Sequence, residues 1–193
     1  MWISLDGNIG SGKTTIANKF KEIGYIVFFE ETHKWEEDGW IQKYYQNIDK
    51  YAGYFQLRII LSHLSISKKI KEIQSNNPNA IIITERSFFS SQEVFGKMLL
   101  DDKILEDMIF KLCGEFKDLL FDEPDLFIYL DCSPQECINR IEKRNRKGES
   151  NISLDYLEKV DRAYQTFIKE HSSIVIKSHG EIDDIFNNII EKI

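Results

Sequence analysis

Short apolar runs and longer segments with helical spacing alternate along the chain. Five runs are rich in β-branched and aromatic residues and have the length of strands, at residues 2–5, 25–29, 80–84, 126–130 and 174–176. The segments between them carry apolar residues at helical spacing. Strands that alternate with helices are typical of a parallel sheet covered on both faces. The pattern therefore predicts an α/β fold with a five-stranded parallel sheet flanked by helices.

The clearest helical pattern spans residues 55–73. Its polar positions include Lys68, Lys69 and Lys71, which would face water. Pro78 ends it, because proline disfavours helical geometry in the preceding residue and has no backbone N–H to donate. We expect a long helix that lies over the sheet. Its apolar stripe would consist of Phe55, Ile59, Leu61, Leu64, Ile66, Ile70 and Ile73.

A glycine-rich motif joins the first predicted strand to the first helical segment. Residues 7–14 read Gly-Asn-Ile-Gly-Ser-Gly-Lys-Thr and match the phosphate-loop pattern G-x-x-x-x-G-K-[ST]. Ile16, Phe20 and Ile23 mark the apolar face of the following helix, so the motif has the strand-loop-helix context that it requires. Such a loop points several backbone N–H groups at one anion, and the helix N-terminus adds positive potential.

The loop indicates nucleotide binding. Lys13 would supply a mobile cation for the outer phosphates, and Thr14 would offer its hydroxyl to Mg²⁺. The loop alone does not tell whether water, a protein or a metabolite accepts the phosphoryl group. The residues expected to bind the nucleotide here are Gly7, Asn8, Ile9, Gly10, Ser11, Gly12, Lys13, Thr14 and Thr15.

Composition and charge narrow the class of protein. With 193 residues and 42% hydrophobic content, the chain can bury one sizeable core, so we expect a single domain over residues 1–193. The net charge of −7 opposes passive binding to nucleic acid, whose phosphates attract broad basic surfaces.

The cysteines and the lengths of the apolar runs indicate the cellular compartment. Three cysteines without zinc-finger spacing predict reduced thiols in a cytoplasmic protein, in the host cytoplasm if the source is viral. No apolar run approaches the ~20 residues of a membrane span. The first strand-like run starts at Trp2, so we expect no cleavable signal and no membrane association.

Acidic and aromatic residues follow the second predicted strand. Residues 28–35 read Phe-Phe-Glu-Glu-Thr-His-Lys-Trp. In an α/β sheet the carboxyl ends of the strands border the ligand crevice, and a carboxylate there can accept a hydroxyl proton. Glu30 and Glu31 both meet this description, and the alternative is that both are solvated carboxylates at a strand end.

These residues resemble the deoxyribonucleoside kinase family, which includes deoxycytidine, deoxyguanosine and mitochondrial thymidine kinases, and the resemblance extends over nearly the whole chain. In that family a glutamate closes the strand and a tryptophan follows five positions later, a spacing kept by Glu30 and Trp35. The resemblance implies that Glu30 is the general base. The family's usual proline after the glutamate is replaced by Glu31, which stays the alternative base.

The resemblance also implies where the nucleoside binds. Tyr45 and Gln56 stand at the separation at which the family carries a sugar-contacting tyrosine and a base-reading glutamine, with Tyr44 as the alternative to Tyr45. A glutamine side chain has one acceptor and two donors, which suits a base edge. Phe95, ten residues after Glu85, matches the aromatic residue on which the family stacks the base, although its helical spacing alone would predict a core position.

Charged residues stand at the end of the third predicted strand. Glu85-Arg86-Ser87 resembles the family's E-R-S motif. The resemblance implies that Arg86 holds phosphate or the 5′-oxygen near Glu30, since a planar guanidinium can serve a carboxylate and a developing phosphoryl charge. Glu85 would contact Mg²⁺ or its waters. From the residues alone, Glu85 and Arg86 could also form a structural ion pair.

Positive charge concentrates after the fourth predicted strand, where we expect a helix that carries Arg140, Arg144 and Arg146. The segment at about residues 140–150 resembles the family's arginine-rich lid. A movable lid can bring cations to the γ-phosphate oxygens and exclude water. The resemblance implies that Arg144 and Arg146 bind phosphate and that Glu149 binds the sugar 3′-hydroxyl, while Arg140 supports the helix or reaches the site. A solvated basic helix end is the alternative. The charged residues concerned are Arg140, Arg144, Arg146, Lys147 and Glu149.

Two further positions bear on the base preference. His63 lies seven residues after Gln56 and would face the same side of the helix. In related enzymes an arginine there pairs with an aspartate on the next helix and accompanies the use of purines and cytosine, whereas these positions are His63 and Ser91 here. The resemblance therefore favours thymidine and deoxycytidine over purine deoxynucleosides. The other histidines lack ligand spacing and would lie at the surface: His33, His171 and His179.

Together with the phosphate loop, the resemblance implies transfer of phosphate from ATP, with Mg²⁺, to the 5′-hydroxyl of a deoxynucleoside. It also implies the three-layer fold of the phosphate-loop kinases and a homodimer joined through helices. Two other functions share parts of the pattern. A nucleoside-monophosphate kinase similar to thymidylate kinase has the same loop and a basic lid. A non-catalytic nucleotide-binding subunit would keep the fold, but it would have no need of Lys13, Glu30, Arg86 and Arg144, which are all present.

Overall fold

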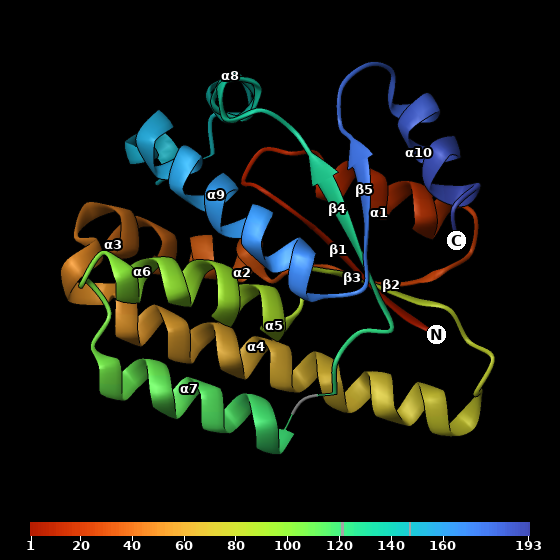
Figure 1. Cartoon of the computed structure of the whole chain (residues 1–193), viewed down its shortest axis with the longest axis horizontal. Coiled ribbons are helices and arrows are strands. Elements are labelled where there is room, and N and C mark those ends of the chain that lie inside the picture. Colours follow the sequence, from red (N-terminus) through yellow and green to blue (C-terminus); the bar gives the residue numbers. More distant parts are fainter. Residues whose placement is uncertain (121, 147) are drawn as a thin grey trace.

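In a computed structural model, which describes residues 1–120, 122–146 and 148–193, a sheet of five parallel strands runs through the middle of the protein (Figure 1). The strand order is β2-β3-β1-β4-β5, and each strand pairs in parallel with its neighbours. The five predicted strands are confirmed, with ends that differ by two residues or fewer. The strands are β1 (Trp2–Gly7), β2 (Ile26–Phe28), β3 (Ile82–Glu85), β4 (Leu126–Asp131) and β5 (Ser173–Lys177).

Helices connect the strands. A π-helical stretch, η1 (Ser91–Gly96), lies between two short α-helices, and a 3₁₀ turn, η2 (Glu149–Asn151), lies at the end of the predicted lid. No helix in the described parts of the chain is both long and apolar enough to cross a bilayer. The α-helices are α1 (Lys13–Glu22), α2 (Thr32–Glu37), α3 (Trp40–Gln46), α4 (Ile48–Asn76), α5 (Phe88–Ser90), α6 (Lys97–Asp101), α7 (Asp107–Leu120), α8 (Pro134–Arg144), α9 (Leu154–Glu170) and α10 (Ile182–Ile190).

Both faces of the sheet are covered by helices. Successive side chains of a strand point to opposite faces. In β4, Ile128 and Leu130 therefore pack with α1 and α10, whereas Phe127 and Tyr129 pack with α9 on the other face. Helix α4 lies on the same side as α9, with α7 beyond it (Figure 1). The three-layer architecture expected for a phosphate-loop kinase is confirmed.

Helix α4 is longer than its sequence pattern predicts. It starts at Ile48 because the side-chain oxygen of Asn47 caps it, accepting a hydrogen bond from the backbone N–H of Lys50 at 3.0 Å. Gly53 and neighbouring polar residues obscure the apolar period of this first part. At the other end Asn77 is the C-cap and Pro78 follows, as predicted.

The predicted environments of three side chains are wrong. Leu61 in α4 and Ile23, which follows α1, are 62% and 56% exposed and lie outside the core. Ile23 is the C-cap of α1, so it lies past the helical face that its spacing suggested. His171 is half-buried instead of lying at the surface, with Nε2 2.7 Å from Glu93 and Nδ1 2.6 Å from Glu123. These carboxylates come from distant segments, which spacing along the chain does not reveal.

The carboxyl ends of four neighbouring strands lie along one edge of the sheet. Register places Glu85 of β3 beside Leu5 of β1, and Gly7 of β1 beside Leu130 of β4. The segments that leave this edge are the phosphate loop after β1, the acidic segment after β2, the charged motif after β3 and the lid after β4. The parallel order therefore gathers all the predicted site segments at one edge.

Candidate active site

The phosphate loop between β1 and α1 depends on glycine. Gly7, Gly10 and Gly12 have φ angles of 145°, 82° and 101°, which residues with a side chain rarely adopt. A Cβ on Gly7 would lie 2.6 Å from Oγ of Ser11, and one on Gly10 would lie 2.6 Å from the carbonyl oxygen of Cys137. Both the turn itself and the contact between the loop and α8 therefore require a residue without a side chain.

Lys13, the first residue of α1, is buried and folds back over the loop. Its Nζ donates hydrogen bonds to the carbonyl oxygens of Gly7 at 3.0 Å and Asn8 at 2.7 Å. Burial, with the positive charge of Arg86, lowers the pKa of Lys13 to about 7. A bound polyphosphate would add negative charge and favour the ammonium form, so anion binding and protonation of Lys13 are coupled.

Side chains that follow β4 and β5 hold the loop from outside. Arg140 Nη1 donates to the carbonyl oxygen of Ser11 at 3.3 Å, and its Nη2 donates to that of Ser178 at 3.0 Å. Ser178 Oγ donates to the same Ser11 oxygen at 2.6 Å. On the other side, Asn8 Nδ2 donates to the carbonyl oxygen of Leu157 at 2.8 Å. The loop shape is thus fixed by three separate elements.

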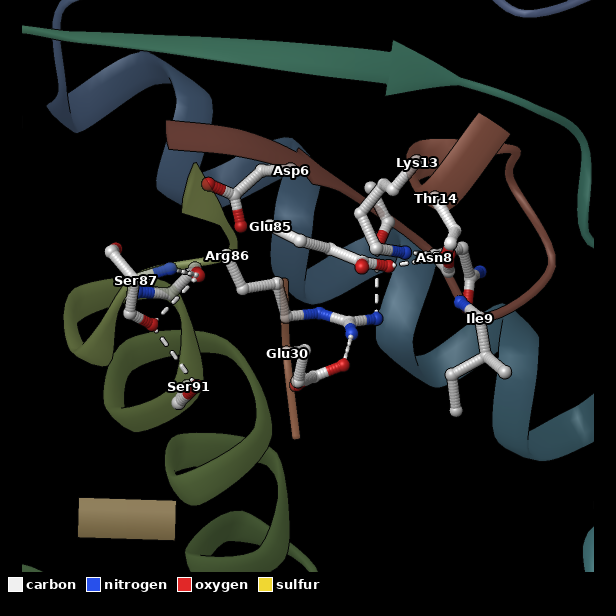
Figure 2. Close-up of polar contacts among 12 residues, drawn as sticks. Asp6, Asn8, Ile9, Lys13, Thr14, Glu30, Glu85, Arg86, Ser87 and Ser91 are labelled. Atoms are coloured by element: carbon white, nitrogen blue, oxygen red, sulfur yellow. Dashed lines mark hydrogen bonds and ion pairs between the residues drawn. The ribbon is translucent and has the colours of Figure 1, made fainter. Parts of the chain in front are cut away.

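Glu30 and Arg86 form a buried ion pair beside the loop (Figure 2). Arg86 Nη1 donates to Glu30 Oε2 at 2.6 Å, and Nη2 donates to the carbonyl oxygen of Gly7 at 3.2 Å. Glu30 follows β2 and Arg86 follows β3, so the pair joins two adjacent strand ends to the phosphate loop. Burial raises the pKa of the Glu30 carboxyl, and the charge of Arg86 opposes this rise without cancelling it.

Glu31 belongs to a separate polar cluster. Its carboxylate accepts hydrogen bonds from Lys34 Nζ at 2.6 Å and Ser62 Oγ at 2.9 Å, and it lies 3.5 Å from Arg58 Nη2. The hydrogen bond from Lys34 is the main reason that the pKa of Glu31 is lowered. Glu31 is not among the residues that line the cavity containing Glu30. A carboxylate with a lowered pKa is also the weaker proton acceptor of the two.

The two residues predicted to bind Mg²⁺ lie together. Thr14 Oγ1 donates to Glu85 Oε1 at 2.7 Å (Figure 2). Mg²⁺ prefers oxygen ligands, and in nucleotide sites it takes one or two protein oxygens together with waters and phosphates. The hydroxyl and the carboxylate fit that requirement. Within residues 1–120, 122–146 and 148–193, no group of three or more His, Cys, Asp or Glu side chains is arranged to hold a metal without such partners.

A cavity of about 350 Å³ extends from the phosphate loop to α4, within the usual size range of ligand sites. The structure brings together in it every predicted residue of the nucleoside site and both predicted phosphate-binding arginines. Of the predicted loop residues, Gly7, Asn8 and Ser11 lie outside its lining. The predicted residues that line it are Ile9, Gly10, Gly12, Lys13, Thr14, Thr15, Glu30, Trp35, Tyr45, Gln56, Glu85, Arg86, Phe95, Arg144, Arg146 and Glu149.

Gln56 has an unpaired acceptor at the cavity. Its side chain is buried on α4, and Oε1 has no hydrogen-bond partner among the described residues. Leaving such a group unpaired costs ~1–3 kcal/mol. Packing alone gives no reason for a glutamine here, whereas a ligand with a donor would satisfy it.

Aromatic and neutral polar side chains complete the cavity wall. Phe95 lines the cavity, with Arg86 Cζ 5.0 Å from the centre of its ring, and it also packs against the hydrophobic core, so both of its predicted environments apply. Ser91 also lines the cavity and lies 3.1 Å from Nε2 of His63. Burial lowers the pKa of His63 to about 3, so this pair is neutral. Tyr44 lines the cavity beside Tyr45.

Both lid arginines bind Glu149. Arg144 Nη2 donates to Oε2 at 2.6 Å, and Arg146 Nη1 donates to Oε1 at 3.1 Å. Helix α8 ends at Arg144 because Asn145 adopts a left-handed conformation with φ 51°. The helix predicted to carry all three arginines is therefore shorter than expected, and Arg146 lies beyond its end. Lys147 lies outside the described residues.

Sequence comparison identifies the family. A profile of the deoxynucleoside kinase family matches residues 3–192. The chain belongs to the deoxynucleoside kinase family. Among the functions that the sequence leaves open, the family assignment favours the first: the protein is a deoxynucleoside kinase, an enzyme that phosphorylates a deoxynucleoside.

Relatives and solved structures agree with this assignment. The kinase is 32% identical over 177 residues to a deoxyadenosine kinase of Dictyostelium discoideum, which covers 90% of this chain and 69% of that protein. It is 25% identical over 200 residues to a deoxyadenosine/deoxycytidine kinase of Bacillus subtilis, covering 99% and 88%. Its fold is similar to that of a deoxyadenosine kinase from M. mycoides with dCMP and dCDP bound, with a TM-score of 0.84, 25% identity and coverage of 100% and 98%. A structure of a deoxyadenosine kinase from M. mycoides with bound dATP gives a TM-score of 0.80 and 26% identity, and the match again covers 100% of this chain and 98% of that chain.

Sequence reasoning missed two residues that the kinase places beside Arg86. Asp6 directly precedes the phosphate loop and is buried, and Tyr164 of α9 lies between Asp6 and Arg86. A carboxylate at the carboxyl end of a strand was the signal applied to Glu30, and the same signal would have identified Asp6. Nothing in the sequence around Tyr164 distinguishes it from an ordinary core aromatic residue.

Proposed function

We propose that the kinase transfers the γ-phosphate of ATP to the 5′-hydroxyl of its deoxynucleoside, with Glu30 as the general base. The buried pair of Glu30 and Arg86, 2.6 Å apart and facing the cavity beside the phosphate loop, carries this proposal. A carboxylate whose pKa is raised by burial is a better proton acceptor than an exposed one. The bond from Arg86 to Gly7 ties this base to the loop that would hold the phosphates.

The side chains would act mainly through position and charge. The N–H groups of the loop and Lys13 would hold the outer phosphates, which would draw Lys13 Nζ from the two carbonyl oxygens that it contacts. Arg86 would stabilise the charge that develops on the transferred group. Glu30 would take the hydroxyl proton late, because the transition state of phosphoryl transfer is loose.

Thr14 and Glu85 would hold Mg²⁺. Their oxygens are 2.7 Å apart and both side chains line the cavity, on the loop side of Arg86. When bound, Mg²⁺ supplies positive charge that neutralises the phosphate oxygens. Thr14 would then turn its hydroxyl from Glu85 to offer a lone pair instead of a proton.

The nucleoside would lie between α4 and η1. The unpaired Oε1 of Gln56 and its amide N–H groups would read the base edge, and Phe95 would stack on the base. Trp35 and Tyr45 would border the sugar, and Glu149 would accept a hydrogen bond from the 3′-hydroxyl. With the roles of Glu30 and Arg86, each predicted residue of the nucleoside site would have a partner in the substrate.

The lid arginines would exchange one anion for another. Arg144 and Arg146 both bind Glu149 in this structure, so phosphate oxygens must compete with Glu149 for them. When the arginines move to phosphate, Glu149 loses two cationic partners and becomes free to accept from the sugar. Phosphate binding and sugar binding would thereby be coupled through the lid.

We propose a preference for thymidine and deoxycytidine over purine deoxynucleosides. The neutral pair of His63 and Ser91 stands where the resemblance would place an arginine and an aspartate. Without those charges, Gln56 is the main polar group facing the base. Its acceptor and donors match the N–H and carbonyl of thymine, and equally the amino group and ring nitrogen of cytosine.

We also propose a homodimer, in which a second copy of this chain covers α4 and α7. These helices pack together, and their outer faces expose large apolar residues of a kind that marks interfaces. Sedimentation would show a dimer, and a monomer at micromolar concentration would contradict the proposal. The exposed residues are Tyr54, Leu61, Met108, Leu112 and Leu119.

A substrate panel with purified protein tests the proposed reaction. ATP and Mg²⁺ are supplied with each of the four natural deoxynucleosides, and thymidine monophosphate serves as the control acceptor. We expect the highest kcat/KM with thymidine or deoxycytidine and no transfer to the monophosphate. A purine deoxynucleoside as the best substrate would contradict the base preference while leaving the kinase assignment intact.

Glu31 provides a matched control for Glu30. We expect Glu30→Gln to lower kcat by roughly 10²–10⁴-fold while nucleotide binding is retained. Glu31→Gln changes the neighbouring residue in the same way, yet this residue lies outside the cavity, so most activity should remain. Equal losses in the two variants would contradict the role of Glu30 as the base.

A further inference from the structure

A hydrogen-bonded chain continues behind Arg86. Arg86 Nε donates to the hydroxyl of Tyr164 at 3.4 Å, and that hydroxyl donates to Oδ1 of Asp6 at 3.3 Å. Asp6 is buried, and its other carboxylate oxygen accepts a hydrogen bond from Ser4 Oγ at 2.5 Å. In Figure 2 the Arg86 side chain runs between the carboxylates of Asp6 and Glu30. Three strands and α9 therefore contribute to one continuous polar network.

At Tyr164, the donors and acceptors of this series of hydrogen bonds can be assigned in one way. A guanidinium only donates hydrogen bonds, so the hydroxyl of Tyr164 must accept from Arg86. The single proton of that hydroxyl must then go elsewhere, and Oδ1 of Asp6 is the acceptor in reach. Asp6 thus orients the Tyr164 hydroxyl so that its lone pair faces Arg86.

Tyr164 also contacts the aromatic ring beneath Arg86. The Arg86 guanidinium lies over Phe95 with Cζ 5.0 Å from the ring centre. The ring of Tyr164 meets Phe95 edge-on, with 6.1 Å between ring centres and an angle of 89°. Arg86 itself has φ 62°, a left-handed value that a residue with a side chain holds only when its surroundings fix it. Tyr164 is one of those surroundings.

We propose that Tyr164, oriented by Asp6, is a positioning residue for phosphoryl transfer. It fixes Nε of Arg86, while Glu30 and the Gly7 carbonyl oxygen take the other two nitrogens, so the place of the Glu30 carboxylate depends on Tyr164. This inference rests on the role proposed for Glu30. Tyr164 and Asp6 do not line the cavity and act only through Arg86.

Tyr129 offers a matched control. Its side chain is fully buried in the same aromatic cluster, with its ring centre 5.1 Å from that of Tyr164. Its hydroxyl donates to the carboxylate of Asp161 at 3.0 Å, and it has no bond to Arg86. Tyr129→Phe therefore removes a comparable tyrosine–carboxylate bond without touching the catalytic arrangement. An effect of packing or stability alone would appear in both variants.

Steady-state kinetics test the proposal. A misplacement of about 1 Å can cost on the order of 10²-fold in rate, so we expect Tyr164→Phe to lower kcat by about 10- to 100-fold, with KM for the nucleoside within about threefold of the original. Tyr129→Phe should stay within about threefold in both constants. In a Glu30→Gln background, Tyr164→Phe should cost no more than about threefold further, because the group that it positions is gone.

The outcomes separate this inference from the proposed function. A large loss in Glu30→Gln with unchanged kcat in Tyr164→Phe would overturn the inference alone, as would an undiminished loss in the double variant. A small loss in Glu30→Gln would overturn the role of Glu30 and with it the inference.

Asp6 provides a second test that does not require Tyr164→Phe to fold. Asp6→Asn keeps an oxygen that can accept from Tyr164, whereas Asp6→Ala removes it. We expect the asparagine variant to retain several-fold more of its kcat than the alanine variant. Equal losses in kcat would overturn the orienting role of Asp6.

Discussion

Oε2 of Glu30 lies 2.6 Å from Nη1 of Arg86, and only 9% and 7% of the two side chains are exposed. Burial favours the neutral carboxyl, the guanidinium favours the carboxylate, and burial prevails. Two more charges act on the same group, since Glu85 raises its pKa and Lys13 lowers it. The pKa of Glu30 therefore depends on three charged side chains beside the phosphate loop, those of Arg86, Glu85 and Lys13.

We expect kcat/KM to fall on acidification with an apparent pKa above 4.5, the ordinary value of a glutamate. The sign follows from the chemistry: only the deprotonated carboxylate accepts the hydroxyl proton, so activity is present above the raised pKa of Glu30 and is lost below it. A pH–rate profile measures this limb. The limb should be missing from Glu30→Gln, and its persistence there would assign it to another group.

Lys13 leads to a prediction at the other end of the pH range. Its pKa of about 7 in the free protein means that part of the population is neutral at pH 8. Bound phosphates favour the ammonium, so nucleotide binding at pH 8 should take up protons, while binding at pH 6 should take up few. Calorimetry in buffers of different ionisation enthalpy measures the number of protons taken up. No uptake at pH 8 would mean that Lys13 is already charged in the free protein.

The strands and the phosphate loop could be predicted because their determinants are local. Each strand is a short apolar run, and the left-handed turns at Gly10 and Gly12 are dictated by the glycines themselves. The order β2-β3-β1-β4-β5 was not predicted, since it depends on pairing between segments far apart in the chain. The end of α8 was missed because Asn145 stops it through an unusual backbone conformation.

The choice between Glu30 and Glu31 could not be made from their positions. Both carboxylates follow the same strand, and what separates them is their partners: Arg86 from β3 for one, Ser62 and Arg58 from α4 for the other. Such partners are set by tertiary packing, which spacing along the chain does not encode. The family resemblance favours Glu30 as the general base. The deeper burial of Glu30 than of Glu31 is a physical reason that favours the same residue.

Gly10 and Gly24 separate backbone strain from steric contact. Both have positive φ, 82° and 93°, but a Cβ on Gly10 would lie 2.6 Å from the Cys137 carbonyl oxygen, whereas one on Gly24 would meet no atom within 4 Å. Gly24→Ala should cost about 1–2 kcal/mol of unfolding free energy from strain alone. Gly10→Ala should cost more and weaken nucleotide binding, because α8 must move. Chemical denaturation and nucleotide titration measure both effects, and equal costs would argue against the contact with α8.

Thr14 should control the need for Mg²⁺. Thr14→Val keeps the shape of the side chain but removes the hydroxyl that lies 2.7 Å from Glu85, so the Mg²⁺ concentration for half-maximal activity should rise by about tenfold or more. Thr14→Ser restores the hydroxyl and should return the requirement close to its original value. Mg²⁺ titrations at fixed ATP test this. An unchanged Mg²⁺ requirement in the valine variant would remove Thr14 from the set of ligands.

Gln56 should show a conflict between binding and stability. Gln56→Leu removes the base-reading amide, and the loss of hydrogen bonds worth ~1–3 kcal/mol should raise KM for the nucleoside on the order of 10- to 100-fold. The free kinase should become more stable by about 1 kcal/mol, because the unpaired Oε1 disappears from a buried site. Gln92→Leu is the matched control: its Oε1 is also buried and unpaired in the described structure, but it lies outside the cavity, so KM should change less than about twofold. A higher KM in Gln56→Leu together with a higher free energy of unfolding would indicate that Gln56 serves substrate binding at the expense of stability. An unchanged KM would contradict its role in reading the base.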